Sequence, residues 1–306
     1  MMKILITGGV GYIGYSLTKQ LLQSKNDIDE IVIYDNLSRK NYAFFSTEKL
    51  NSKPIKFIDG EILDSKKLRD NLKGIDVVFH LAAKVTTPYA DNESHFFDQV
   101  NHWGTSEVVN AVEESNVKHF IHLSSISVYG STEETVDEDY SPHPHSFYGI
   151  SKYKAEEHVN RLSSKIKTHI IRSGNVYGYN PAIRIDAAIN KFLFQANFTG
   201  RITINGNGTQ TRAYIHLEKL SHLLSEIINT DMPTGTYNIV EHVFSINDVV
   251  FEIKELYPEL EALFVNQNMK MRQIKVHTPC KILDYLKWNE KSFKEELIEF
   301  KEQFAF

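Results

Sequence analysis

Two residues one helical turn apart carry the clearest chemistry in this sequence. Tyr148 and Lys152 are four positions apart in a segment of helical pattern, so their side chains lie on one face. A phenol with a pKa near 10 is a poor base at neutral pH. An ammonium group one turn away lowers that pKa and favours the phenolate. The pair therefore predicts a base that removes the proton of a hydroxyl group, although the same spacing also occurs by chance.

A serine cluster supports this interpretation. Ser124, Ser125 and Ser127 follow a buried apolar run and so lie at the carboxyl end of a predicted strand. A serine there can share a hydrogen bond with the substrate oxygen that Tyr148 deprotonates. Serines at strand ends also form turns that have no function. A serine cluster followed by a Tyr-x-x-x-Lys pair, both after a nucleotide-binding loop, is far harder to obtain by chance.

That loop is a glycine-rich segment near the start of the chain. Residues 7–14 read TGGVGYIG, between a short apolar run and an amphipathic segment. Glycines there permit a sharp turn and the close approach of a pyrophosphate, which then meets the first amides of a helix. This context predicts a dinucleotide site. The residues expected around the pyrophosphate are Gly8, Gly11, Tyr12, Ile13 and Gly14.

An acidic residue follows the second predicted strand. Asp35 lies 21 positions after Gly14, where a carboxylate accepts hydrogen bonds from the adenosine ribose. It would repel a 2′-phosphate, which favours NAD over NADP, but Arg39 and Lys40 close behind leave NADP open. An alternative interpretation is that Asp35 only caps its own loop.

Two further strand ends offer parts of the same site. After the third predicted strand, Glu61 can hold the adenine amino group and Ile62 can pack against the ring. The carboxylate would equally suit the cap of the next helix. After the fourth strand, Leu81, Ala82 and Ala83 lie beside the path of the pyrophosphate and ribose, and tight packing alone would also explain small side chains there.

The elements that must position these residues alternate between strands and helices. Buried apolar runs predict strands, and amphipathic runs between them predict helices. This alternation predicts an α/β fold, a Rossmann doubly wound parallel sheet with helices on both faces. The predicted strands cover residues 4–6, 31–34, 55–58, 77–81, 120–123 and 168–171, and the predicted helices cover residues 12–23, 65–72, 93–115 and 148–164.

The pattern loosens after residue 178. We expect a cofactor-binding domain over residues 1–178 and a smaller substrate-binding lobe over residues 179–306, part of which returns to the sheet. Within the lobe, helices are predicted at residues 186–196 and 218–229 and a strand at 202–204, with further pieces at 237–240, 247–256 and 292–304.

Composition sets the broad class. The 306 residues carry a net charge of −5 with scattered Lys and Arg, so nucleic acid is not an expected partner. The single Cys280 has no partner for a disulfide, the thirteen histidines are scattered, and no metal site is expected. No apolar run approaches the roughly 18 residues of a membrane span. With a strand predicted to begin at Lys3, we expect a cytoplasmic protein without a signal peptide.

Together these motifs resemble the extended short-chain dehydrogenases/reductases, within the NAD-dependent epimerase/dehydratase family that acts on nucleotide sugars. The likeness runs from Lys3 to about Trp288 and includes TGGVGYIG at 7–14, DNLS at 35–38 and HLAA at 80–83. It implies NAD as cofactor and Ser125, Tyr148 and Lys152 as the catalytic triad. It also adds Asn36, Ser38, Lys84 and Asn101 to the cofactor site and extends that site to Tyr148 and Lys152.

The resemblance implies substrate-binding residues as well. Asn175 would contact the diphosphate or the sugar, together with Lys84 and Ser125. Arg212 would clamp the nucleotide diphosphate, since its planar guanidinium suits phosphate oxygens, and Arg272 would supply a second contact. Taken alone, Arg212 would be a surface salt-bridge residue.

Residues 126 and 127 distinguish reaction types within the family. Members that dehydrate the sugar carry an Asp-Glu pair directly after the active Ser/Thr, and sugar-acid decarboxylases carry a Glu two residues before the tyrosine that matches Tyr129. This chain has Ile126 and Ser127 instead, so elimination lacks its acid. The sequence thus favours an epimerase, most often at C4, in which Tyr148 takes the hydroxyl proton while hydride passes to NAD and back.

Two other functions stay open from sequence. One is an NAD(P)H-dependent 4-keto nucleotide-sugar reductase of the same fold, and the other is a sensing or scaffold protein that binds NAD without turnover. The resemblance further implies a homodimer formed by the helices predicted at 93–115 and 148–164. Apolar positions compatible with that interface, or equally with packing on the sheet, are Val108, Val109, Val112 and Val159.

Overall fold

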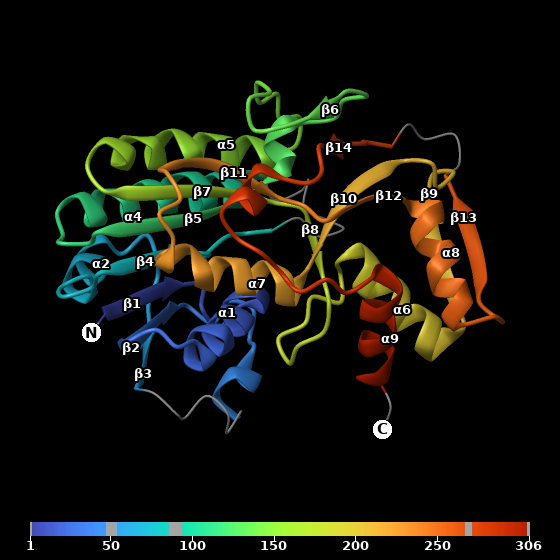
Figure 1. Ribbon diagram of the computed structural model, residues 1–306, viewed down its shortest axis with the longest axis horizontal. Helices are drawn as coiled ribbons and strands as arrows, with labels where there is room; N and C mark the ends of the chain where they lie inside the picture. The colour runs from blue at the N-terminus through green and yellow to red at the C-terminus, as the bar shows by residue number, and fades with distance from the viewer. Residues whose placement is uncertain (1, 47–53, 86–93, 267–270, 305–306) are drawn as a thin grey trace.

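Six strands that end before residue 178, together with β11 from the second half of the chain, form one parallel sheet in the order β11-β7-β5-β4-β1-β2-β3 (Figure 1). The computed structural model describes residues 2–46, 54–85, 94–266 and 271–304. The doubly wound Rossmann fold predicted from sequence is confirmed. The strands of this sheet are β1 (Met2–Thr7), β2 (Ile28–Asp35), β3 (Ile55–Asp59), β4 (Val77–His80), β5 (His119–Ser125), β7 (Lys167–Ser173) and β11 (Gly235–Ile239).

The strand order reverses at β1, which pairs with β2 on one side and β4 on the other. A crevice opens at the carboxyl ends of the strands where such a reversal occurs, and ligands of open α/β sheets bind there. The glycine-rich loop follows β1 directly, and residues 81–83 follow β4. The topology therefore brings both segments to one edge of the sheet.

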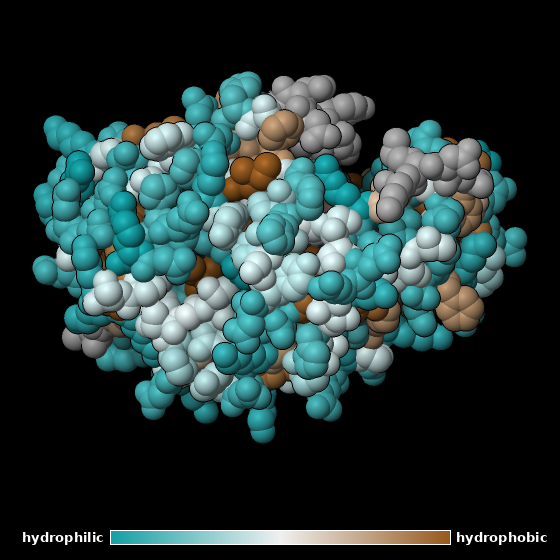
Figure 2. All heavy atoms as spheres, turned by 90° about the horizontal axis from the view of Figure 1, so that it is seen from above, coloured by the Kyte–Doolittle hydropathy of each residue, from teal (hydrophilic) through white to brown (hydrophobic). Residues whose placement is uncertain are grey.

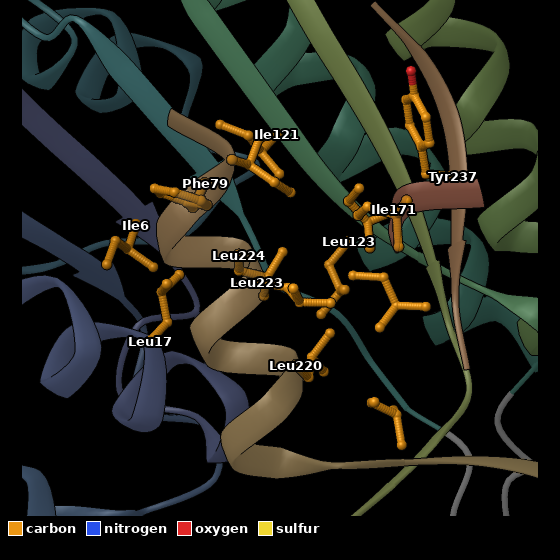
Figure 3. Packing of buried hydrophobic residues seen from close by; sticks show 14 of the residues in the cluster. Ile6, Leu17, Phe79, Ile121, Leu123, Ile171, Leu220, Leu223, Leu224 and Tyr237 are labelled. Atoms are coloured by element: carbon orange, nitrogen blue, oxygen red, sulfur yellow. The ribbon is translucent and has the colours of Figure 1, made fainter. Parts of the chain in front are cut away.

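Helices cover both faces of the sheet. On one face, α1 (Tyr12–Gln23) and α7 (Leu217–Glu226) pack their leucines against the strands, and Figure 3 shows Leu17 and Leu220 meeting strand residues such as Phe79 and Leu123. On the other face lie α2 (Ser65–Asn71), α4 (Gly104–Glu113) and α5 (Phe147–Asn160). Burying both faces of the sheet explains why its strands are nearly continuous apolar runs.

The four valines suggested for a dimer interface belong to the core. Val108, Val109, Val112 and Val159 are all buried in the cluster between the sheet and helices α2, α4 and α5. The surface seen in Figure 2, on the side of the molecule where α5 lies, is mainly hydrophilic. Packing on the sheet is thus the correct interpretation of these positions.

The helix predicted over residues 93–115 is interrupted. It consists of α3 (Ser94–Phe97), a π-helical turn (Asp98–Trp103) and α4, while Glu93 lies outside the described residues. The wider turn sets Asn101, which is fully buried, between the chain after β4 and helix α5. Single π turns of this kind often occur at functional sites.

The second half of the chain contributes both to the central sheet and to the smaller lobe. Strand β11 pairs with β7 and α7 packs on α1, so part of the chain does return to the sheet. The division at residue 178 itself stays a prediction. No helix in the described ranges is long and apolar enough to cross a membrane.

The remaining elements form the smaller lobe, around a cluster that includes Tyr177, Leu193 and Leu297. Its helices are α6 (Ala188–Thr199), α8 (Ile246–Leu256) and α9 (Phe293–Glu302). Its strands are β8 (Asn175–Tyr177), β9 (Arg201–Asn205), β10 (Thr211–His216), β12 (His242–Ser245) and β13 (Glu261–Val265), and the short β6 (Thr135–Val136) pairs with β14 (Lys275–Val276).

Candidate active site and cofactor pocket

A cavity of about 710 Å³ lies at the carboxyl ends of β1, β2 and β4. This volume is within the usual range for small-molecule sites. The cavity brings together fourteen of the residues assigned to the cofactor from sequence: Gly8, Gly11, Tyr12, Ile13, Gly14, Asp35, Asn36, Ser38, Glu61, Ile62, Leu81, Ala82, Ala83 and Lys84.

The glycine loop has the geometry of a phosphate cradle. Gly8 has a φ of +71°, and a Cβ there would lie 2.6 Å from the backbone nitrogen of Ala82. A Cβ at Gly14 would lie 2.5 Å from the carbonyl oxygen of Gly8. Gly11 begins α1 without a side-chain cap, so the first amides of the helix are left for a ligand. An anionic pyrophosphate fits this arrangement of amides and helix dipole.

Asp35 holds its own loop and also lines the cavity, and its contact with the ribose stays a prediction. Its two carboxylate oxygens accept the backbone N–H groups of Val10 (3.0 Å) and Leu37 (2.8 Å), so it does hold its own loop. Burial raises the pKa of this carboxyl, and the two N–H donors oppose that rise. Each oxygen has a further lone pair, and Asp35 lines the cavity, so ribose hydroxyls can also be accepted.

Glu61 is not a helix cap. Asp64 caps α2 by accepting from Lys67, whereas the Glu61 carboxylate accepts from the side chain of Asn36 (2.6 Å) and the backbone of Ile62 (2.8 Å). These contacts fix Glu61 at the end of the cavity that also holds Asn36. The adenine contact assigned to Glu61 and Ile62 stays a prediction.

The three residues assigned to catalysis meet at the end of β5. Ser125 is the last residue of β5, while Tyr148 and Lys152 lie on the first turns of α5, which Ser146 caps by accepting from Gly149 (3.0 Å). The Ser125 hydroxyl is close to both the Tyr148 phenol and Ser127 Oγ (3.1 Å), and its single proton can be donated to either one. A substrate hydroxyl can therefore approach Ser125 and Tyr148 together.

The charges around the phenol differ from the sequence-based prediction. Burial raises the pKa of Tyr148, and the charge that opposes this rise is that of Arg184, helped by the hydrogen bond from Ser125. Lys152 is 2% exposed and its Nζ donates to the carbonyl of Leu123 (2.7 Å). Burial lowers the pKa of Lys152 to about 8. Arg184 is thus the cation whose charge opposes the rise in the pKa of Tyr148 in this structure, and the role of Lys152 toward the phenol stays a prediction.

Arg184 was missed because it lies in an aperiodic loop between β8 and α6. Asn180 ties this loop to helix α1 through the carbonyl of Tyr12 (2.8 Å), and Arg184 pairs with Asp186 (2.7 Å). The available signal in the sequence was the pair of opposite charges, Arg184 and Asp186, shortly after the end of β8. Further cavity residues that sequence reasoning did not assign to the site are Val10, Tyr34, Leu37, Arg39, Lys40, Asn41, Gly60, Val85, Phe96, Val100, Val176, Ala182, Ile183 and Asp186.

Asn101 is fully buried and does not line the cavity, and its assignment to the cofactor stays a prediction. Its oxygen accepts the backbone N–H of Lys84 (2.8 Å), and its nitrogen donates to the Lys84 carbonyl (2.9 Å) and to Ser151 Oγ (2.9 Å). The side chain thereby joins the chain after β4 to the catalytic helix. Asn101 therefore helps to position Lys84 and helix α5 relative to each other.

The residues assigned to the substrate form a second group in the lobe. Arg212 on β10 donates to the backbone carbonyl of Arg272, so the two arginines lie side by side. Burial lowers the pKa of Arg212, and the charge of Arg272 acts in the same direction. Asn175 on β8 donates to the carbonyl of Ala213 (3.0 Å), next to Arg212 in the chain. Their contact with a diphosphate stays a prediction.

The structure also gathers acids and a histidine in a place that sequence spacing did not indicate. Ligand atoms of Glu241, His242 and Glu296 lie within 4.8 Å of one another. The ammonium of Lys219 lies 2.7 Å from Glu296 and also contacts Glu241, so it already supplies a cation to this cluster.

Comparison with known proteins adds to this geometry. The model of the NAD dependent epimerase/dehydratase family matches residues 4–239. The chain belongs to the NAD-dependent epimerase/dehydratase family. Its likeness to this family was stated from residues 7–14, 35–38 and 80–83, and the family match confirms it.

Relatives in this epimerase/dehydratase family include both reaction types. The chain is 32% identical to dTDP-D-glucose 4,6-dehydratase of Mus musculus, over 85% of this chain and 74% of the relative. It is 28% identical to a putative UDP-glucose 4-epimerase of Methanocaldococcus jannaschii, over 83% of this chain and 85% of the relative. Relatives of this chain within the family thus include nucleotide-sugar dehydratases and a putative epimerase.

A solved structure shows the same fold with ligands. UDP-glucuronic acid 4-epimerase from Bacillus cereus, in complex with UDP-glucuronic acid and NAD, superposes with a TM-score of 0.86 at 26% identity, covering 99% of this chain and all of the other. NAD is the cofactor of this epimerase/dehydratase-family chain, and the cradle of Gly8, Gly14 and Asp35 fits it.

Proposed function

We propose that this chain is a nucleotide-sugar epimerase that acts at sugar C4. The observation that carries the proposal is the chemistry of the two residues after Ser125. Ile126 is buried and apolar, and Ser127 is held by Ser125, so neither can protonate a leaving hydroxyl group.

One acid within the cavity could be thought to replace the missing pair. Burial would raise the pKa of Asp186, but the hydrogen bond and charge of Arg184 outweigh it and leave that pKa below its ordinary value. Asp186 is therefore ionised at neutral pH and is a poor proton donor. Reversible oxidation and reduction of the sugar is the chemistry that the described residues support.

The residues divide the work as follows. Hydride transfer from and back to the sugar carbon is the chemistry that NAD supplies. Ser125 and Tyr148 hold the substrate hydroxyl, and the Tyr148 phenolate, stabilised by Arg184, takes its proton. Arg212 and Arg272 hold the diphosphate while the 4-keto sugar turns its other face, and Tyr148 then returns the proton.

The proposal is tested by proton NMR of a panel of nucleotide sugars incubated with the protein and no added cofactor. UDP-glucose, UDP-N-acetylglucosamine, GDP-mannose and dTDP-glucose cover the common bases. We expect a new stereoisomer of unchanged mass from one of them. No conversion, together with NAD(P)H consumption when a 4-keto nucleotide sugar is supplied, would instead make the protein a reductase. Release of water from the sugar would make it a dehydratase.

A homodimer and a cytoplasmic location also belong to this proposal. Because the valines of α4 and α5 are buried, a dimer formed by these helices would use exposed groups such as Trp103 and Phe147. Both aromatic residues lie on the same helical layer as the buried valines, on its outward side.

Replacing Arg184 by Gln is expected to move the acid limb of the kcat/KM profile to higher pH by about one pH unit. The change removes the charge that opposes the burial-driven rise in the pKa of Tyr148, so less phenolate is present at pH 7. Activity should approach that of the parent at high pH. Arg201→Gln, which removes an exposed cation paired with Glu261 on β13, is the control. An acid limb that stays in place would contradict the assignment of Arg184.

A further inference from the structure

The catalytic helix carries a second buried charge. Glu156 lies four residues after Lys152 on α5, and each of the two residues is 2% exposed. Residues four apart lie on the same face of a helix, so Glu156 continues the face that packs on the sheet. A buried carboxylate is expensive unless it is paired and hydrogen-bonded. Its partners therefore show what it holds together.

Those partners come from two neighbouring strands. The Glu156 carboxylate accepts a hydrogen bond from Ser124 Oγ (2.5 Å) on β5. It also accepts two hydrogen bonds from the guanidinium of Arg172 on β7, one from Nε (3.1 Å) and one from Nη2 (2.7 Å). Ser124 and Arg172 are opposite each other in the parallel ladder. One carboxylate thus ties the helix to the sheet at the residue directly before Ser125.

The contacts continue from Arg172 to the end of the sheet. Its guanidinium lies 4.8 Å from the ring centroid of Tyr129, in the turn that follows Ser125. The Tyr129 hydroxyl donates to Asn238 Oδ1 (2.8 Å) on β11. The strand ends around Ser125 are therefore fixed by a buried network that has Glu156 at its centre.

Glu156 also sets the charge balance around Lys152. The other titratable groups that face Lys152 from the sheet are His80 on β4 and His122 on β5, both fully buried. Burial lowers the pKa of His80 to about 3 and that of His122 well below 6.5, so both rings are neutral. Burial likewise lowers the pKa of Lys152, and the charge of Glu156 opposes it.

We propose that Glu156 is a positioning residue, whose buried carboxylate fixes the catalytic helix, and with it Lys152, against the strand of Ser125. The role in turnover rests on the proposed epimerase function, whereas the effect on the charge of Lys152 does not. Ser124 and Arg172 act with Glu156 by holding its carboxylate. These three residues are joined by hydrogen bonds, so their effect on the reaction is indirect.

The test is an NMR titration of the full-length protein with ¹³C-labelled lysine, which follows the Lys152 side chain without any substrate. In Glu156→Gln the midpoint for Lys152 should fall by about one pH unit or more. The alkaline limb of the kcat/KM profile should fall with it, while KM changes little. Glu157→Gln, an exposed neighbour on the same helix, is the matched control and should leave both unchanged.

Loss of one partner from a buried ion pair can unfold a protein. The double variant Glu156→Gln with Arg172→Met removes both charges and carries the same test if the single variant is unstable. A folded variant of either kind in which Lys152 titrates as in the parent would overturn the inference. If the parent protein converts no sugar in the panel, the proposed function fails, but the titration still decides the role of Glu156.

Discussion

Tyr148→Phe is expected to lower kcat by about 10²- to 10⁴-fold, the range for loss of a positioned acid–base group. The hydroxyl that Ser125 contacts disappears, while the ring keeps its edge-on packing against Phe97 at 6.0 Å between centroids. Binding of NAD and the melting temperature should therefore change little. Kinetics on the substrate found by NMR, with calorimetry of NAD binding, would check both parts.

Tyr153→Phe is the control for this substitution. Tyr153 is half-buried on the same helix and packs against the core next to the sheet. Its loss of a hydroxyl should leave kcat within a few-fold of the parent. Equal losses in the two variants would show that any tyrosine hydroxyl on α5 matters for folding, and Tyr148 would lose its assignment as the base.

Gly8→Ala is expected to abolish retention of NAD during purification and to lower the melting temperature. A left-handed backbone costs an alanine about 1–2 kcal/mol, and the new Cβ would also lie 2.6 Å from the Ala82 nitrogen. Relief of that contact moves the glycine loop away from residues 81–82, which pack directly against it at the edge of the cavity. The cofactor content of the purified protein, from its absorbance at 260 nm relative to 280 nm, reports the result.

Gly74→Ala separates the two causes. Gly74 also has a left-handed backbone, at φ +78°, but a Cβ there would meet no atom within 4 Å. It should show the backbone strain alone, with a lower melting temperature and normal NAD content. Comparable NAD loss in Gly74→Ala would mean that general instability, rather than the shape of the loop, empties the site.

Local signals explain most of what the sequence predicted. The glycine loop, Asp35 and the Tyr148–Lys152 pair lie next to strand ends or on one helix, so spacing along the chain fixes their neighbours. The six strands of the first half could be predicted for the same reason, since buried parallel strands are apolar throughout.

What the sequence could not supply depends on contacts between distant segments. The charge of Arg184 acts on the pKa of Tyr148 because residues 178–187 fold back over α1, and nothing in their pattern indicates this. Asn101 bonds Lys84 and Ser151 from a π-helical turn, which looks like ordinary helix in sequence. The valines of α4 were ambiguous because a core and an interface have the same apolar composition.

The late return of β11 to the central sheet bears on how the protein is made. Synthesis proceeds from the N-terminus, and β7 is complete at Ser173 long before Gly235–Ile239 emerges from the ribosome. During that interval β7 is a sheet edge with unpaired backbone groups, the kind of surface that recruits other chains. At about 5–20 residues per second the exposure lasts several seconds. The nascent chain therefore passes through a period of aggregation risk that ends only when Gly235–Ile239 has been translated and has paired with β7.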